Sequence, residues 1–519
     1  MNIELGKILG GMGIYFVFII AVALAFVRRS NADAESFFLG RRALGPWVSA
    51  LSAEASDMSG WLLMGLPGVA YFYGLGMEAF WTAAGLALGT WINWKIVAKR
   101  LRTYSETAGN AFTLPSFFSN RFHDRRHILL CISSALIIIF FSIYVGAQFV
   151  TFGKLFNYLF NVPHYEKHII IVGAILVFVY TLLGGFLGES FTDFVQGLLM
   201  VLAVVLVFVF GISAAGGFNT MFGKLSDVPR FLDVFGIAEP LADNPGLFGA
   251  GRPNSLLNII TCAAWGLGYF GMPQVLLRFM AIKNPARLAQ ARLIAVTWCV
   301  ISLFACVGIG LIGRAWEPNL FSTASESELI FLVMAKEFFP PVLAGLVLSG
   351  ILGASMSSAD SYMLITSSSI ANDLIKNSFF KNTTEKAVLW IARVTMLAVT
   401  IFGLFVALSG STTIFKIVSY AWAGLGASFG PLILFSLFWR RTTLAGAAAG
   451  ILTGGASVII WKHVVAAYGR AHGISALTVY ELLPAFIISS IVIVAVSLAT
   501  PKPSEDIEAE FEKARSLAK

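Results

Sequence analysis

Two acidic residues, Glu54 and Asp57, stand three positions apart inside the apolar stretch SALSAEASDMSGWLLMGLPG. A charged side chain at bilayer depth is costly and normally faces an aqueous cavity or a partner, so Asp57 is the first candidate for an ion path. The alternative is an Asp that only hydrogen-bonds neighbouring helices. The Ser59-Gly60 step predicts a helix break, where freed carbonyls could bind a cation and freed N–H groups could meet an anionic substrate.

A second apolar stretch, CAAWGLGYFGMPQVLLRFM, is interrupted in a similar way. The residues that interrupt it are Gly266, Gly268, Gly271 and Pro273. Paired Gly/Pro-interrupted segments in corresponding positions of two halves predict an inverted-repeat transporter with a binding site at the breaks. Trp265 and Tyr269 lie one helical turn apart in this stretch, and either line that site or serve aromatic packing.

Hydroxyl residues crowd a third stretch, GILGASMSSADSYMLITSSS. At helical spacing one face of it carries Ala354, Ser357, Ser358 and Ser361. Close helix packing alone explains small residues in such a row. A hard monovalent cation prefers several oxygen ligands, so the Ser357 and Ser358 hydroxyls together with carbonyls of a broken helix could form its cage.

Two isolated charges have simpler interpretations. Asp193 follows Ser190 and Thr192 at the start of an apolar segment, where helix capping is the simplest interpretation. Arg42 precedes Gly45 and Pro46, and is interpreted as a cytoplasmic anchor, with gating of a pathway as the alternative.

Two histidine pairs have the spacing of a zinc-binding helix, but neither has an obvious third ligand. They are His123 with His127 and His164 with His168. We therefore expect no transition-metal site. No phosphate loop, nucleophile elbow or dinucleotide fingerprint stands in a strand-to-helix setting, so we expect neither an enzyme nor a cofactor.

The composition requires lipid as the solvent. Of 519 residues, 57% are hydrophobic and 12% are charged, and the mean hydropathy is +0.81, which leaves too little polar surface for an aqueous fold. The net charge of +8 comes from Lys and Arg spread between apolar spans, without a basic stripe that would bind nucleic acid.

A bilayer core needs roughly 20 apolar residues per helix, and about 13 segments meet that length. They cover about 8–27, 45–72, 77–98, 128–152, 168–187, 194–215, 253–281, 289–313, 340–371, 388–408, 414–438, 442–463 and 478–499. This pattern predicts an all-α polytopic membrane protein with one domain over 1–500 and a tail over 501–519. The inverted repeats would cover about 45–215 and 253–438, with one helix before them and two after.

Basic residues predict the orientation, because cytoplasmic loops retain Lys and Arg. Alternate loops with the tails carry 21 basic residues on one side and 9 on the other. The richer side is expected to be cytoplasmic, which places the N-terminus outside and the C-terminus inside. The loop over about 216–252 would then be outside, and the acidic-to-basic tail suits a short cytoplasmic helix.

Several stretches together resemble the bacterial sodium/proline symporters of the sodium/solute symporter family over essentially the whole chain. The segments that carry the resemblance are LSAEASDMSGWLLMGLPG, WINWK, WGLGYFGMP, RFM, MSSADS and SYAWAGLGASFGP. The resemblance implies a LeuT-like core of two inverted five-helix repeats.

The resemblance also assigns site residues. Sodium would be bound by the carbonyls of Ala55, Met58 and Ala354 and the hydroxyls of Ser357 and Ser358, and Asp57 would be required for sodium-linked transport. Residues matching the substrate site are Ser59, Gly60, Trp61, Tyr144, Trp265, Tyr269 and Pro273. Arg42 and Asp193 match positions that affect coupling or gating.

Three residues depart from the family pattern. Glu54 stands where a small or amide residue is usual, and is expected to be protonated, turned to the cytoplasmic vestibule or paired with a base. Met272 replaces the amide expected beside Pro273, and Ser358 stands where Thr is common.

The function implied is symport of L-proline into the cell across the cell membrane, driven by sodium and working by alternating access. Its partners would be L-proline, sodium and the lipid bilayer. The alternatives are a symporter of another small solute, coupled to sodium or to protons through Asp57 or Glu54, and a channel.

Overall fold

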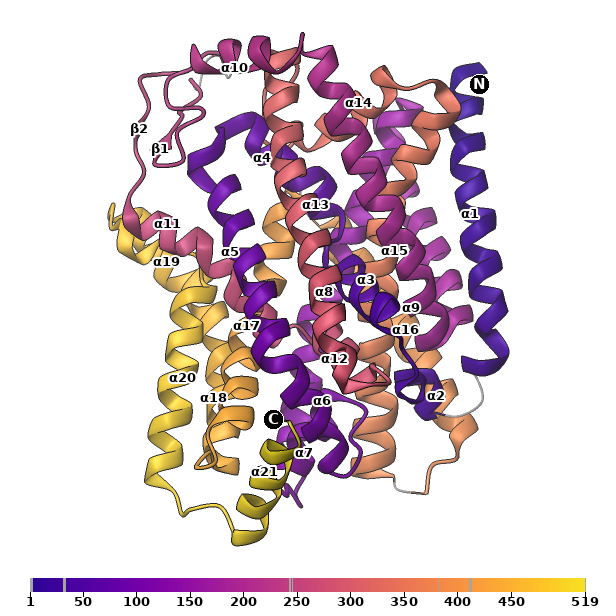
Figure 1. Cartoon of the computed structure of the whole chain (residues 1–519), viewed down its shortest axis with the longest axis vertical. Helices are drawn as coiled ribbons and strands as arrows, with labels where there is room; N and C mark the ends of the chain where they lie inside the picture. Colours follow the sequence, from indigo (N-terminus) through magenta and orange to yellow (C-terminus); the bar gives the residue numbers. More distant parts are fainter. Residues whose placement is uncertain are drawn as a thin grey trace.

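Nearly upright helices packed side by side form the structure (Figure 1). This computed structural model describes residues 3–30, 34–241, 244, 246–380, 382–409 and 413–518. Within these residues the only sheet is an antiparallel pair of two-residue strands, β1 (Gly236–Ile237) and β2 (Arg252–Pro253). The two ends of the chain lie at opposite ends of the bundle (Figure 1).

Nine helical stretches of the described chain are long and apolar enough to cross a membrane, or ten if one bent pair counts as a span. The elements that supply most or all of each stretch are α1 (Ile3–Ser30), α8 (Ile128–Phe160), α9 (Glu166–Ala214), α13 (Leu288–Trp316), α15 (Pro341–Ser368), α16 (Glu385–Leu408), α17 (Ile414–Phe438), α18 (Leu444–Ile460) and α20 (Leu482–Ala499). The chain is therefore a multi-pass helical membrane protein.

The first predicted break is confirmed. Helix α3 (Pro46–Asp57) ends at Met58, whose backbone is non-helical (φ −83°, ψ 73°), and the chain resumes as a π-helical turn, η2 (Trp61–Gly65), and α4 (Leu66–Tyr73). A further π turn, η3 (Leu75–Ala79), leads into α5 (Phe80–Ile92) and then η4 (Asn93–Val97).

The second predicted break is confirmed as well. Helix α11 (Leu256–Ala263) tightens into a 3-10 helix, η6 (Ala264–Gly271), and Met272 is extended before α12 (Pro273–Ala281) begins on a proline. Proline fixes φ for a first helical turn but cannot continue a preceding one, so the axis bends here by 44°.

One pair of expected spans is joined by a kink in place of a loop. The sequence predicts two helices, 168–187 and 194–215, with a short loop between them, and α9 consists of two helices separated by a sharp kink at Gly185 (φ 53°, ψ 179°). Only glycine adopts this backbone conformation without strain, so one residue makes the bend that the loop was expected to make.

Shorter elements cover the two ends of the bundle. At the end that holds the C-terminus they are α2 (Ala34–Leu39), η1 (Gly40–Arg42), α6 (Ala98–Thr107), α7 (Leu114–Arg121), η7 (Pro285–Arg287), η9 (Ser369–Phe379) and the tail helix α21 (Glu505–Leu517). The opposite end carries η5 (Pro163–Tyr165), α10 (Phe218–Ser226), η8 (Ser327–Leu329), α14 (Ile330–Phe338), η10 (Trp461–Val465), α19 (Ala466–Ala471) and η11 (Ser475–Leu477).

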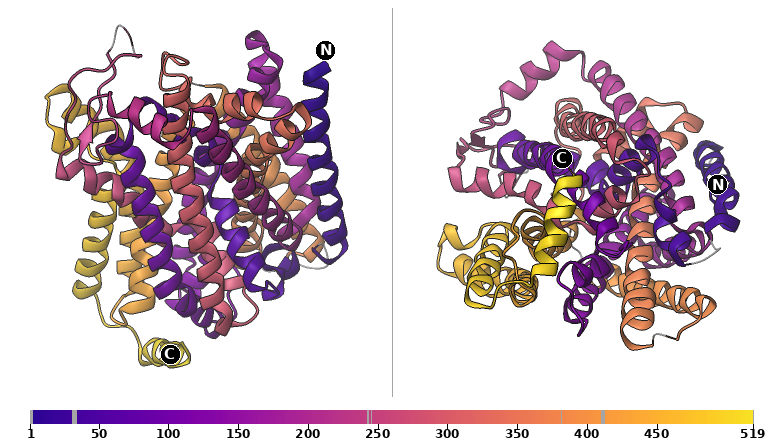
Figure 2. Two further views of the ribbon diagram at one scale, coloured as in Figure 1. Left: turned by 45° about the horizontal axis from the view of Figure 1, so that its top comes forward. Right: turned by 60° about the horizontal axis from the view of Figure 1, so that its bottom comes forward.

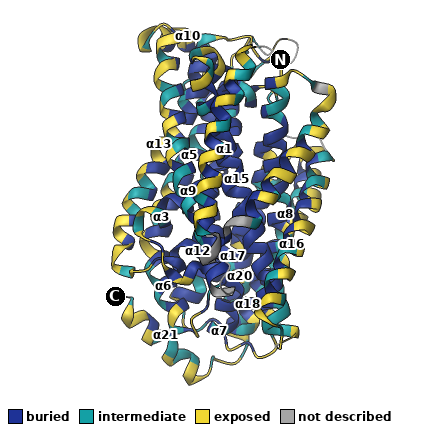
Figure 3. Ribbon diagram, turned by 90° about the vertical axis from the view of Figure 1, so that its right-hand side faces the viewer, coloured by how far each residue is buried: buried dark blue, intermediate teal, exposed yellow. Residues whose placement is uncertain are grey.

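Burial falls from the middle of the bundle to its rim. The most apolar 18-residue windows of α15 and α17 are 83% buried, against 33% in α1 and α20. Figure 3 shows the same gradient, with buried residues inside and exposed ones outside. The exposed rim is itself apolar, as along α16 at Trp390, Val394 and Phe405, which is the surface that lipid requires.

Helix α5 and the 3-10 helix η6 lie against each other because glycines remove the side chains between them. A Cβ added at Gly89 of α5 or at Gly266 of η6 would collide with the other segment's backbone, and one at Gly268 would collide with the indole of Trp422. This close approach brings η6 to the middle of the bundle, between α5 and α17. Figure 2 shows the bundle from two further directions.

Candidate functional site

The break after α3 leaves backbone groups without helical partners. The N–H of Met58 still bonds to the carbonyl of Glu54 at 2.8 Å, but Ser59 N–H turns to the carbonyl of Asp57, and Gly60 N–H reaches only Gln148 Oε1, at 3.4 Å. A Cβ at Gly60 would collide with Thr151, so glycine is what lets the chain pass here. The break therefore exposes carbonyls and N–H groups at the middle of the bundle.

Three of the five predicted sodium ligands meet at one hydroxyl. Ser357 Oγ lies 2.8 Å from the carbonyl oxygen of Ala55 and 3.2 Å from that of Ala354, which joins α15 to α3 just before the break. The Ser358 hydroxyl is fully buried and has no hydrogen-bond partner. Backbone carbonyls and serine hydroxyls are the neutral oxygen ligands that a monovalent cation accepts.

Asp57 connects the two broken helices. Gln274 Nε2, directly after Pro273 on α12, donates to Asp57 Oδ1 at 3.0 Å, and Tyr269 of η6 also hydrogen-bonds to this buried carboxylate. The Trp61 indole N–H lies 3.4 Å from the Asp57 carbonyl. Pro273 itself faces a small cavity of about 10 Å³ beneath the site, together with Thr113 and Ser368.

Glu54 is buried, at 1% exposure, and therefore does not face an open vestibule. Its Oε1 accepts a 3.3 Å hydrogen bond from the Trp94 indole, and its Oε2 has no partner. No Lys, Arg or His among the described residues lies within ion-pair distance of Glu54 or Asp57, so the expected pairing of Glu54 with a base is wrong.

Aromatic rings surround the space beside the break. Trp265 packs with ring centroids 5.8 Å from Trp61 and 5.0 Å from Phe415, and its carbonyl accepts from the Trp422 indole at 2.9 Å. The Tyr269 ring meets Trp422 edge to face at 5.2 Å. Trp265 and Tyr269 thus join the packing and also face the break, so the two interpretations of this pair are compatible.

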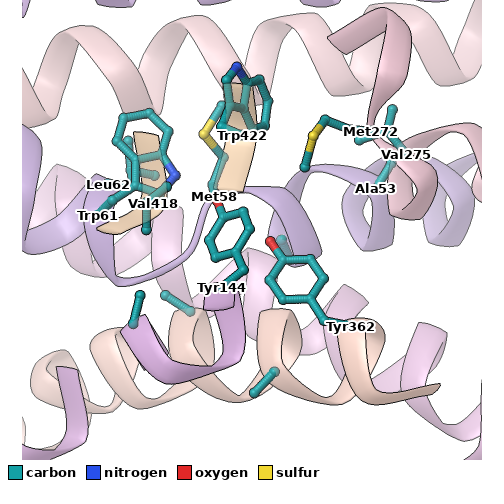
Figure 4. Packing of buried hydrophobic residues seen from close by; sticks show 14 of the residues in the cluster. Ala53, Met58, Trp61, Leu62, Tyr144, Met272, Val275, Tyr362, Val418 and Trp422 are labelled. Atoms are coloured by element: carbon teal, nitrogen blue, oxygen red, sulfur yellow. The ribbon is translucent and has the colours of Figure 1, made fainter. Parts of the chain in front are cut away.

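Tyr144 of α8 lies on the other side of the break, 4.5 Å from the ring of Tyr362. Tyr362 donates to the carbonyl of Ser56 at 2.9 Å, and Tyr144 is in hydrogen-bonding contact with Tyr362 and Ser59. Figure 4 shows Met58, Trp422, Tyr144 and Tyr362 gathered around the break.

The site is closed towards both ends of the bundle. Among the predicted sodium and substrate residues, none of the side chains of Asp57, Ser59, Trp61, Tyr144 and Trp265 is more than 2% exposed. Entry and exit of a solute therefore require parts of the bundle to move.

Arg42 links several segments at the closed end of the bundle, the end that holds the C-terminus. Its guanidinium donates to the carbonyls of Met280 at 2.5 Å and Ala111 at 2.7 Å, and to the side chains of Asn110 and Ser105. It therefore ties η1 to α12 and to the loop after α6. Arg42 is therefore buried, and its two interpretations, an anchor or a gate, both stay predictions.

Glu328 links α8 and α17 at the opposite end of the bundle. Its carboxylate accepts from Lys154 Nζ at 2.5 Å and from the backbone N–H groups of Ile414 and Phe415 at 3.2 Å each, which are the first groups of α17. A carboxylate at a helix N-terminus is favoured by the unpaired N–H groups there. Because Phe415 packs on Trp61 and Trp265, this contact links η8 to the aromatic rings of the site.

Asp193 is not a helix cap, which corrects the simplest interpretation of the sequence. It lies inside α9, fully buried, and its Oδ2 is 3.0 Å from Arg278 Nη2 and 2.8 Å from Ser52 Oγ. Arg278 also contacts Glu189 and donates to Ser361 Oγ at 2.9 Å. The network joins α3, α9, α12 and α15 just below the break.

Sequence reasoning missed the partners in this network and the role of Gln274. Arg278 and Glu189 each stand in or beside an apolar span, and an ionisable residue there signals a buried partner. Asp360, next to Ser361, is a third buried carboxylate beside the network. Each signal was visible singly, but which acid meets which base depends on the packing of four helices.

Comparison with known proteins agrees with this architecture. A model of the sodium:solute symporter family matches residues 37–454. The sodium/proline symporters of Staphylococcus aureus strains USA300 and NCTC 8325 are each 38% identical to the chain over 511 residues, covering 98% of this chain and 96% of the relative.

Two solved structures share the fold. A sodium-coupled sialic acid symporter, in a substrate-bound outward-open state, superposes with a TM-score of 0.76 at 16% identity and covers 97% of this chain and 99% of its own. A nucleobase-cation-symport-1 family transporter, in a closed conformation, superposes with a TM-score of 0.52 at 13% identity, covering 92% and 98%.

Proposed function

The chain belongs to the sodium:solute symporter family, and we propose that it carries L-proline into the cell together with sodium. The observation that supports this substrate most strongly is the 38% identity to sodium/proline symporters over nearly the full length of both chains. The sodium gradient supplies the free energy, so the protein is a secondary transporter and not an enzyme.

Sodium binds between α15 and the end of α3. The ligands are the carbonyls of Ala55, Met58 and Ala354 and the hydroxyls of Ser357 and Ser358. The short distances from Ser357 Oγ to two of these carbonyls support the arrangement. The Ser357 hydroxyl would rotate its hydrogen away, so that sodium binds between these oxygens and fixes the broken helix against α15. Asp57, next along α3, supplies the negative charge that a cation in the bilayer requires.

Proline binds at the break beside that ion. Its carboxylate meets the backbone at Ser59 and Gly60, where N–H groups lack helical partners, and its apolar ring packs among Trp61, Trp265, Tyr269 and Tyr144. Pro273 shapes the lower wall. The weak 3.4 Å contact of Gly60 N–H supports this assignment, because that donor is available to a stronger acceptor.

Transport follows alternating access around this site. Sodium orders the break and raises the affinity for proline, and proline raises the affinity for sodium to the same degree. Opening to the cytoplasm requires release of the contacts of Arg42, and rearrangement of α9 against α12 acts on the Asp193–Arg278 pair. These two residues therefore affect coupling without contacting the solute.

The core consists of two inverted repeats, about 45–215 and 253–438, within about 13 spans of one domain over 1–500. The two broken segments, α3 to α4 and α11 to α12, occupy corresponding positions in the halves, which supports the repeat. The N-terminus faces the outside of the cell membrane and the 501–519 tail the cytoplasm, as the basic residues of the loops indicate.

Uptake into proteoliposomes tests this function. Radiolabelled proline is expected to accumulate above its external concentration only with an inward sodium gradient, and excess unlabelled proline but not other amino acids should abolish the signal. Asp57→Asn is expected to lower sodium-driven uptake by about 100-fold, since loss of a charged partner costs about 1.5–3 kcal/mol. Equal uptake with and without the gradient would exclude sodium coupling.

A further inference from the structure

A second group of buried oxygens lies at the end of α3, towards η4 and α12. In a helix, residues three positions apart share a face, so the side chains of Glu54 and Asp57 lie on the same side of α3. The carbonyl of Ala55 meets α15. The carboxylates of Glu54 and Asp57 meet η4 and α12 instead, at Trp94 and Gln274.

The side chains around these carboxylates are oxygen-rich. Tyr269 of η6 neighbours Asp57, Glu54 and the Thr90 hydroxyl of α5. Asn93 Nδ2 donates to the Tyr269 carbonyl at 2.9 Å, which leaves the Asn93 amide oxygen free. Four segments, α3, the end of α5 with η4, η6 and α12, thus converge on one spot.

Three acceptor oxygens of this group have no hydrogen-bond partner although their residues are at most 1% exposed. They are Glu54 Oε2, Asn93 Oδ1 and Gln274 Oε1. Asp57 bonds to Tyr269 as well as to Gln274, and Tyr269 also bonds to the Thr90 hydroxyl. An unpartnered buried polar atom costs about 1–3 kcal/mol, and a buried carboxylate without a counter-charge costs more. Unpartnered acceptors beside two buried carboxylates are an arrangement that a bound cation would satisfy.

The ligand chemistry favours an alkali cation. The group offers oxygens from carboxylates, amides and hydroxyls and no imidazole, and the Cys299 thiol beside it hydrogen-bonds to Thr90 and Tyr269. A hard cation takes such oxygens, whereas transition metals favour nitrogen and sulfur. No base among the described residues forms an ion pair with either carboxylate, so a proton or a bound cation has to neutralise them.

We propose that Glu54 and Asp57, with Thr90, Asn93, Tyr269 and Gln274, form a second sodium site. The inference rests on the proposed function for the first site and extends it. The ligands of the first site are all neutral, so two sodium ions balance the two carboxylates of α3. The second ion also bridges the two broken segments, because Asp57 precedes one break and Gln274 follows the other.

Sodium binding to the purified protein tests the proposal without reference to the solute. Equilibrium binding of radioactive sodium is expected to give about two sites in the parent protein and about one in Glu54→Gln, whose amide keeps the shape but removes the charge. Ser357→Ala is expected to weaken the other site, and a variant with both changes should lose both.

Two further variants serve as a control and as a substitute for Glu54→Gln. Asp373→Asn removes another buried carboxylate, one whose Oδ1 already accepts from Thr113, Ser116 and Asn372, and should keep two sites. Thr90→Val removes one neutral ligand and should weaken the second site about tenfold without changing the count. It serves in place of Glu54→Gln if that variant does not fold.

One sodium site in both the parent protein and Glu54→Gln would overturn the proposal. A proline-driven proton flux that Glu54→Gln abolishes, with an unchanged sodium count, would assign the position to a proton and would overturn it as well. Two sodium sites in a protein that does not transport proline would leave this inference intact and contradict only the proposed function.

Discussion

At the scale of single residues, the site depends on oxygens that lack better partners. Ser357 Oγ donates to the Ala55 carbonyl at 2.8 Å, so the hydroxyl hydrogen occupies the direction from which a cation would be bound. The hydroxyl can rotate and present its lone pairs to an ion instead. A serine in this position can therefore hold α3 to α15 through a hydrogen bond or through a bound ion.

Residue types predicted part of this arrangement. Asp57, Ser357 and Ser358 were identifiable because a carboxylate and adjacent hydroxyls are unusual at bilayer depth. The partners of Asp193 were not identifiable, because its ion pair joins distant parts of the chain: Arg278 lies 85 positions away in sequence. A single sequence does not show that two residues so far apart are in contact.

Arg278 is predicted to be a main stabilising residue of the bundle. Arg278→Ala leaves Asp193 and Glu189 buried without a counter-charge, and breaking such a pair costs about 3–5 kcal/mol. The melting temperature in detergent should fall by several degrees, and Arg278→Lys should give an intermediate value because lysine keeps the charge but loses the forked geometry.

The matched control is Arg252→Ala, which removes an exposed ion pair with Glu239. Exposed pairs contribute at most about 1 kcal/mol, so this variant should melt close to the parent protein. Equal melting temperatures of Arg252→Ala and Arg278→Ala would show that the buried network does not stabilise the fold.

At the scale of elements, the helix breaks that could be predicted were those marked by glycine and proline. The Ser59-Gly60 step and Pro273 marked both breaks correctly. Gly185 was not recognised as the kink that joins two helices directly, because a glycine between two apolar runs equally suits a loop. The π turns η3 and η4 have no comparable sequence signal.

The break at Gly60 is predicted to need its lack of a side chain. Gly60→Ala should lower proline uptake by at least about tenfold, because the new Cβ meets the side chain of Thr151. Adding Thr151→Ala removes the two nearest atoms and should restore part of the uptake. Uptake in the double variant no higher than in Gly60→Ala would place the defect elsewhere.

At the scale of the whole molecule, the membrane setting could be predicted from the sequence. The distribution of burial among the helices could not. An apolar composition indicates lipid, but it does not tell which apolar helix lies at the centre. Helices α15 and α17 are the central ones, and they are also among the less apolar spans, with hydropathies of 1.7 and 1.6 against 2.5 for the peripheral α1. Small and hydroxyl residues allow the close packing that the centre requires.

The orientation can be tested by labelling with a membrane-impermeant maleimide. In a background whose four free cysteines are replaced, Ser475→Cys should react in intact cells, and Ser516→Cys only in inverted vesicles. Both positions are exposed and lie in or beside short elements at opposite ends of the bundle. The reverse pattern would invert the proposed topology.

The central claim is that sodium and proline bind to one broken helix and stabilise each other there. The most direct measurement is equilibrium binding of proline to the purified protein with and without sodium, at constant ionic strength. We predict that sodium lowers the Kd for proline by at least about tenfold in the parent protein, equivalent to about 1.4 kcal/mol of coupling, and by much less in Ser357→Ala. Ser349→Ala, whose hydroxyl bonds only within α15, should behave like the parent protein. A proline Kd that is the same with and without sodium would contradict the account.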